Sequence, residues 1–310
     1  MPSKYDKVII FGPTGDVGGA AALEASKRSA TVWLAMRQIE KSIATIPIAQ
    51  EHSGTFHRVQ ADLTEPESVK VAIRQSGARA AFVYLVFGIP SMEPTFLAMK
   101  DAGIEHVVFL STFSIRPNED RARIPQARII PLVHAQAELA IEKAGLSYTT
   151  LRAGQFASNI LKQGIDRSKT PWEANVVIDK TPRDNISPDD IGKVAGAMLV
   201  DPVAEMRKHV IYLLGPSLLH ERQMVELVER IAGRDITVCE HTPAEMAGFL
   251  KGLGMPPPLM DYMRSVWAGE EWWTGDGTLN GLDYAEVMGN IQKYSGYEPE
   301  TFEQYVAAHL

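Results

Sequence analysis

Three glycines near the start of the chain are typical of a loop that binds the diphosphate of a dinucleotide, although their G-x-x-G-x-x-G spacing is one residue wider than the common G-x-G-x-x-G motif. Gly12, Gly15 and Gly18 follow the apolar run 8–11 and precede a helix-favouring run at 20–27. A strand, a tight turn and a helix N-terminus in this order present backbone N–H groups and the positive end of the helix dipole to an anion. The alternative is a glycine turn that binds nothing. No Gly-Lys-Ser/Thr ends the motif, which argues against a nucleotide-hydrolysing loop. The cofactor-binding residues predicted in this loop are Gly12, Thr14, Gly15, Asp16, Val17 and Gly18.

The charge that follows the second apolar run indicates which dinucleotide would bind. The run 31–36 is followed by Arg37, and no acidic residue occurs before Glu40. An acid here would bond the ribose 2′-hydroxyl of NAD, whereas a guanidinium can hold a 2′-phosphate through two hydrogen bonds. We therefore favour NADP(H), with Arg37 as the phosphate ligand, over an arginine that merely faces solvent. Asp62 and Leu63 follow the third run, and Asp62 either contacts the adenine or caps a short turn.

Apolar runs that alternate with helical stretches predict a parallel sheet covered by helices on both faces. The predicted strands lie at 8–11, 31–36, 55–60, 80–87, 106–111 and 147–151, and the helices between them at 19–28, 66–75, 90–102 and 126–144. Right-handed crossovers between such strands give an α/β, doubly wound Rossmann-type sheet. Ligands of this fold bind beyond the carboxyl ends of the strands.

The alternation weakens after the sixth predicted strand, which indicates a second part of the chain. We expect an NAD(P)-binding domain at 1–152, to which 184–215 returns, and a smaller, mostly helical substrate-binding lobe at 153–183 and 216–310. The segment 275–277 is either a lid or a connector. Most large apolar residues of this lobe are expected in its core, and those that reach the crevice would suit a flat apolar substrate. These residues are Phe249, Met255, Met260, Tyr262, Met263, Trp267, Trp272 and Trp273.

The composition of the chain excludes several classes of function. The 310 residues are 45% hydrophobic and carry a formal net charge of −7, so nonspecific nucleic-acid binding is not expected. No apolar run has the length of a membrane span, and no His, Cys and acid pattern indicates a metal site. The single cysteine, Cys239, excludes an intrachain disulfide, and we expect a cytoplasmic protein. The expected partner is a small-molecule substrate, and a homodimer is left open.

Taken together, the motifs resemble those of the NmrA-like family of atypical short-chain dehydrogenase/reductases. The resemblance spans nearly the whole chain and rests on segments 12–18, 36–37, 61–63, 107–112, 144–159, 189–192, 233–234 and 296–305. The block Leu-Arg-x-Gly-x-Phe-x-x-Asn within 144–159 is quite specific, although Ala153 stands where the family usually has proline. The family contains reductases of quinones, enones, imines and phenylpropanoid ethers, and also NAD(P)-binding regulators. The resemblance therefore implies cofactor binding more strongly than turnover.

The resemblance also supplies a candidate catalytic residue. Ordinary short-chain dehydrogenases use Tyr-x-x-x-Lys, and no tyrosine of this chain has a lysine four residues later. In several NmrA-like reductases, a lysine early in the helix before the sixth strand contacts the nicotinamide ribose. His134 stands at the corresponding position. The imidazole would donate a proton, hold the ribose, or make only a structural hydrogen bond.

The loops that follow the strands supply the remaining candidates. The further cofactor-binding residues expected there are Val86, Phe87, Gly88, Ser111, Thr112, Gln155 and Phe156. The substrate-binding candidates are Pro90, Phe113, Asn159 and Trp267. The leading hypothesis is an NADPH-dependent reductase of a small conjugated or aromatic metabolite, such as an enone, quinone or imine. The alternative is a noncatalytic NADP(H)-binding, redox-sensing regulator.

Overall fold

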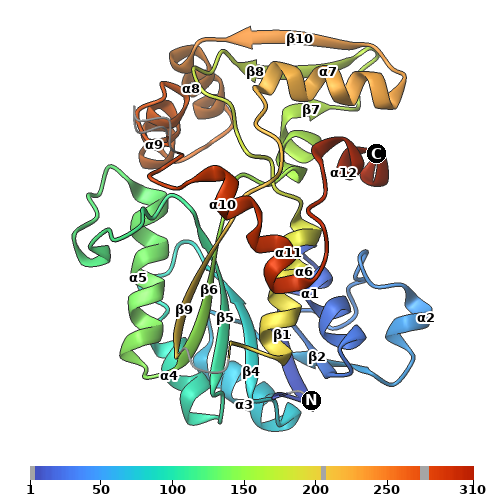
Figure 1. The fold of residues 1–310 in the computed structure, drawn as a ribbon, viewed down its shortest axis with the longest axis vertical. Helices are drawn as coiled ribbons and strands as arrows, with labels where there is room; N and C mark the ends of the chain where they lie inside the picture. The colour runs from blue at the N-terminus through green and yellow to red at the C-terminus, as the bar shows by residue number, and fades with distance from the viewer. Residues whose placement is uncertain (1–3, 204–206, 273–278) are drawn as a thin grey trace.

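A seven-stranded parallel sheet forms the core of the larger, lower part of the molecule in the view of Figure 1. The computed structural model describes residues 4–203, 207–272 and 279–310. Within these ranges the strand order is β3-β2-β1-β4-β5-β6-β9. Successive strands are added on one side of β1 up to β3 and on its other side from β4 onward, which is the switch point of a doubly wound sheet. The strands are β1 (Lys7–Phe11), β2 (Thr31–Met36), β3 (Phe56–Gln60), β4 (Ala80–Tyr84), β5 (His106–Thr112), β6 (Ser147–Ala153) and β9 (Lys208–Leu213). The predicted fold class is confirmed.

Helices cover both faces of this sheet because its strands are apolar on both sides. On one face lie α1 (Asp16–Lys27) and α6 (Pro188–Val200), and on the other lie α3 (Pro66–Ser76), α4 (Glu93–Asp101) and α5 (Ile129–Lys143). The helices α1 and α6 pack closely through small residues. A Cβ added at Gly192 would lie 2.3 Å from the Cβ of Ala20. Residues 184–215 thus supply a helix and a strand to the central sheet.

Some predicted boundaries were wrong where the backbone leaves the sheet. The fourth strand was expected to reach residue 87, but β4 pairs with β5 only as far as Tyr84 and Leu110. Gly88 then has φ of 83°, a conformation that other residues rarely adopt, and α4 starts at Glu93 instead of residue 90. The short helix α2 (Ile48–Glu51) was not predicted. The segment after β4 is therefore a loop at the carboxyl edge of the sheet.

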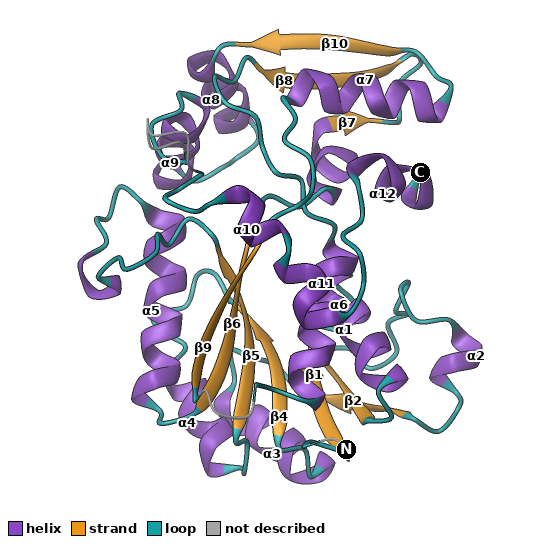
Figure 2. Cartoon of the chain, in the orientation of Figure 1, coloured by secondary structure: helices purple, strands orange, loops and turns teal. Residues whose placement is uncertain are grey.

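The expected second lobe, residues 153–183 and 216–310, lies largely over the carboxyl ends of the strands (Figure 2), but its helix α11 (Asn290–Ser295) packs against α6 in the core of the central sheet. Besides its helices it contains a three-stranded sheet of order β10-β8-β7, in which β10 and β8 run parallel. Its elements are the π-helix η2 (Ile160–Gly164), β7 (Ile165–Asp166), β8 (Trp172–Val177), α7 (Glu221–Ala232), β10 (Ile236–His241), α8 (Pro243–Gly252), α9 (Pro257–Trp267), α10 (Tyr284–Met288), α11 (Asn290–Ser295) and α12 (Phe302–His309). Trp273 and the segment 275–277 lie outside the described residues.

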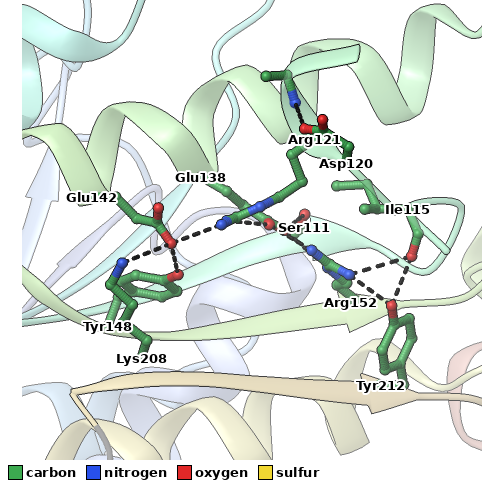
Figure 3. A network of polar contacts seen from close by, with 11 residues as sticks. Ser111, Ile115, Asp120, Arg121, Glu138, Glu142, Tyr148, Arg152, Lys208 and Tyr212 are labelled. Carbon is green, nitrogen blue, oxygen red and sulfur yellow. Dashed lines mark hydrogen bonds and ion pairs between the residues drawn. The ribbon is translucent and has the colours of Figure 1, made fainter. Parts of the chain in front are cut away.

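A buried network of charges ties α5 to the strands beneath it (Figure 3). The Glu138 side chain of α5 is inaccessible to solvent and accepts two hydrogen bonds from the Arg152 guanidinium of β6, at 2.7 and 3.1 Å. Arg121, from the short helix η1 (Arg121–Arg123), donates to Glu138 at 3.2 Å and to Glu142 at 2.7 Å. Arg152 also donates to the Tyr212 hydroxyl of β9 at 2.6 Å. The network fixes the helix that carries His134 against three strands of the sheet.

Candidate functional site

The glycine loop forms a cradle that excludes larger residues. Gly12 has φ of +70°, and its carbonyl oxygen accepts a hydrogen bond from the Gly15 N–H at 3.1 Å. A Cβ at Gly18 would lie 2.3 Å from that same carbonyl oxygen. The loop therefore turns tightly into the N-terminus of α1, where free N–H groups and the helix dipole favour an anion. This geometry fits the diphosphate of a dinucleotide.

A cavity of about 330 Å³ extends from this loop over the ends of β2, β3 and β4. Among its lining residues are Gly12, Thr14, Arg37, Asp62 and Tyr84. Arg37 is exposed, and its guanidinium makes no hydrogen bond or ion pair with a described residue. Its backbone oxygen accepts from Gln60 at 3.2 Å, which fixes the end of β2. A positive charge without a partner thus faces the cavity at the predicted 2′-phosphate position.

Asp62 caps the short turn after β3, which was one of its two predicted roles, and it also lines the first cavity. Its Oδ1 accepts hydrogen bonds from the N–H and the hydroxyl of Thr64, both at 2.9 Å. The hydroxyl of Ser68 donates to the Asp62 backbone oxygen at 3.1 Å. This turn follows β3 directly and brings Asp62 and Leu63 to the cavity wall. A contact with the adenine remains a prediction.

A second cavity, of about 560 Å³, lies between the sheet and the second lobe. The end of β5 and the segments that follow β5 and β6 contribute Thr112, Phe113, Ser114, Gly154, Gln155 and Asn159. The lobe contributes an apolar wall that contains Met246, Leu250, Met255, Leu259, Tyr262, Met263, Trp267 and Trp272. The rings of Phe113 and Trp272 meet edge to face, with centroids 5.0 Å apart. Such a cavity suits a flat apolar molecule.

The polar atoms of this cavity are not all satisfied by the protein. The indole Nε1 atoms of Trp267 and Trp272 are buried and have no hydrogen-bond partner among the described residues. Arg183, which is 4% exposed, pairs with Glu221 and with Asp179 at its far side. Buried donors without partners are costly, and both indoles belong to the wall of this cavity.

Phe87 joins the two cavities, and His134 lies beside it. Phe87 lines both cavities and is 64% exposed. The His134 ring lies 6.3 Å from the ring of Phe87 and 6.3 Å from that of Phe109, measured between centroids. Its Nδ1 atom is buried without a hydrogen-bond partner in the described chain. Burial lowers the pKa of His134 to about 3, so the imidazole is neutral at neutral pH.

Several predicted site residues lie away from the two cavities. Ser111 is 5% exposed, and its hydroxyl donates to Glu138 at 2.8 Å within the buried network. Gly88 and Pro90 line a third, smaller cavity of about 210 Å³ beside the loop after β4. Val86 lines both this cavity and the first one. Val17 packs in the core, and Phe156 pairs with Ile186 in a β-bridge. Of the large apolar residues expected in the lobe, Met260 is buried and Phe249 is 40% exposed.

Sequence reasoning missed other residues of the site. Tyr84 ends β4, and its ring lies so close to Gly12 that a Cβ there would be 2.5 Å from the Tyr84 Cε1. Burial raises the pKa of Tyr84, while the nearby charge of Arg37 lowers it. Ser114 and Leu259 were also missed in the second cavity. Tyr84 was missed because the strand was expected to continue to residue 87, which placed Tyr84 inside it and not at its end.

The doubly wound sheet, the glycine cradle and the adjoining cavity define an atypical short-chain dehydrogenase/reductase architecture. The model of the NmrA-like family matches residues 4–306, and the chain belongs to this family. It is 35% identical, over 100% of its length and 98% of the relative, to the nitrogen metabolite regulation-like protein bik4 of Gibberella fujikuroi. It is 34% identical to agroclavine dehydrogenase of Claviceps fusiformis over 57% of each chain.

A solved structure confirms the fold. The NADPH-dependent quinone oxidoreductase QOR2 of Escherichia coli, solved in complex with NADPH, superposes with a TM-score of 0.69 at 19% identity. The match covers 97% of this chain and 99% of the neighbour. None of the helices in the described part of the chain is both long enough and apolar enough to span a membrane.

Proposed function

We propose that the protein binds NADP(H) across the cradle and the first cavity and reduces a small conjugated or aromatic molecule held in the second. The cradle would hold the diphosphate, and the Arg37 guanidinium would hold the 2′-phosphate. The similarity to agroclavine dehydrogenase and to the NADPH-dependent quinone oxidoreductase QOR2 supports this proposal. The observation that carries it is the open apolar cavity that meets the cofactor cavity at Phe87.

Bound NADPH would supply a hydride to an electrophilic carbon of the substrate. The residues of this chain would orient that carbon and exclude water from it. Phe113, Trp267 and Trp272 form apolar walls that would pack against a flat substrate. Quinones, enones and iminium ions require little acid assistance, which agrees with the absence of Tyr-x-x-x-Lys.

The test is NADPH consumption by the purified protein against a panel of quinones, enones and imines. We expect saturable turnover of at least one class, with NADPH preferred to NADH. A regulator is the second candidate, because the relative that matches the whole chain carries a regulatory name. Tight NADP+ binding without turnover of any panel member would contradict the reductase and favour the regulator.

Replacement of His134 tests the role of this residue in the proposed reduction. Because its imidazole is neutral, we propose that it holds the cofactor ribose by a hydrogen bond and does not act as a cationic acid. His134→Leu should lower kcat/KM about tenfold, the value of one hydrogen bond, while His134→Gln should keep most of the activity. Neither variant should change the pH profile of kcat between pH 5 and 8. Equal activity of His134→Leu and the wild-type protein would remove the proposed role.

A further inference from the structure

One lysine of the second lobe reaches across the molecule to the glycine cradle. Lys162 lies in η2, and its Nζ is 2.5 Å from Oδ2 of Asp16, the first residue of α1. The two side chains are 57% and 32% exposed. An ion pair this exposed adds little to stability, so the chain can lose it without unfolding. The position of the pair beside the cradle indicates a role in binding.

The Asp16 carboxylate at the α1 N-terminus favours a compensating cation beside it. Asp16 follows Gly15 directly and therefore stands beside the site expected for the diphosphate. Asp189, at the start of α6, is also close: burial raises its pKa, the nearby His309 and Lys193 lower it, and the charges of Asp190 and Asp16 raise it. A diphosphate would meet the repulsion of the Asp16 carboxylate. The ammonium group of Lys162 is positioned to neutralise that repulsion.

The same short helix also contributes to the second cavity. Its residues Ile160, Gln163 and Gly164 line that cavity, whereas Lys162 extends to the cradle. Single-turn π-helices are frequent at functional sites. The second lobe thus contributes to both binding regions through one turn of backbone.

We propose that Lys162 is a positioning residue of the cofactor site, which neutralises Asp16 and so admits the diphosphate of a dinucleotide. The inference rests on the proposed binding of NADP(H), and it assigns to Lys162 a role separate from that of Arg37. Because the diphosphate is common to NADP+ and NAD+, the loss of Lys162 affects both equally. A ligand without a diphosphate, such as 2′-AMP, is unaffected.

The test is calorimetric or fluorescence titration of Lys162→Met with NADP+, NAD+ and 2′-AMP. We expect both dinucleotides to bind about tenfold more weakly, with an unchanged affinity for 2′-AMP. The double variant Asp16→Asn/Lys162→Met should recover most of the loss, because the uncompensated carboxylate is then removed. The control is Lys169→Met, which removes another half-exposed lysine of the lobe, one that pairs with Glu173 at 2.8 Å. It should bind all three ligands as the wild-type protein does.

The outcomes separate this proposal from the one on which it rests. If the wild-type protein binds NADP+ and Lys162→Met binds it equally well, only the role of Lys162 is overturned. The same holds if the double variant binds more weakly than Lys162→Met, or if Lys162→Met weakens NADP+ alone. If the wild-type protein binds neither dinucleotide, both proposals are overturned.

Discussion

Replacing Glu138 with glutamine should lower the free energy of unfolding by about 3–5 kcal/mol. The carboxylate is inaccessible to solvent and pairs with two guanidinium groups, those of Arg152 and Arg121. Arg152 is itself 6% exposed, so the variant leaves a buried positive charge without its counterion. The glutamine oxygen still accepts hydrogen bonds, but the glutamine NH2 group is a donor that cannot pair with a guanidinium, and the side chain supplies no compensating charge. The Ser111 hydroxyl would lose its charged acceptor as well.

Urea unfolding of the wild-type protein and of Glu138→Gln measures this difference in the free energy of unfolding. The matched control is Glu105→Gln, which removes the same charge from an ion pair with Arg79. The Glu105 side chain is 45% exposed and that of Arg79 is 57% exposed. That pair is screened by solvent, and its loss should cost less than about 1 kcal/mol. If Glu138→Gln lowers the free energy of unfolding by as little as the control does, the buried network is not needed to hold α5 on the sheet.

The parts of the molecule that were predictable from the sequence depend on contacts between near neighbours in the chain. The glycine cradle needs only a strand, a turn and a helix in succession, and Arg37 follows its strand directly. The doubly wound arrangement follows because parallel strands joined by helices cross over with one hand. For the same reason, the loops after β5 and β6 could be placed beside one cavity.

The parts that were not predictable depend on contacts between residues far apart in the sequence. Lys162 and Asp16 are separated by 146 residues, and no local pattern connects them. Ser111 could face either side of β5, and only the packing of α5 shows that its hydroxyl serves Glu138. Likewise, the neutral state of His134 follows from burial against Phe87 and Phe109, which a helical position alone does not reveal.

Arg37→Glu should weaken NADP+ binding about 100-fold or more while changing NAD+ binding by less than about threefold. The exposed guanidinium lines the first cavity and has no competing partner among the described residues, so its hydrogen bonds are available to a 2′-phosphate. A glutamate there removes these bonds and repels the phosphate, yet can accept a hydrogen bond from the 2′-hydroxyl of NAD.

Titration of both dinucleotides checks this expectation, and Arg74→Glu provides the control. Arg74 is an exposed residue of α3, and its replacement changes the net charge by the same amount at a distance from the cavity. It should leave both affinities within about twofold of the wild-type values because solvent screens separated surface charges. An equal loss of NADP+ and NAD+ in Arg37→Glu would contradict a 2′-phosphate contact. The two variants should therefore differ in kind. Arg37→Glu changes the preference for NADP+ over NAD+, whereas Lys162→Met lowers the affinity for both.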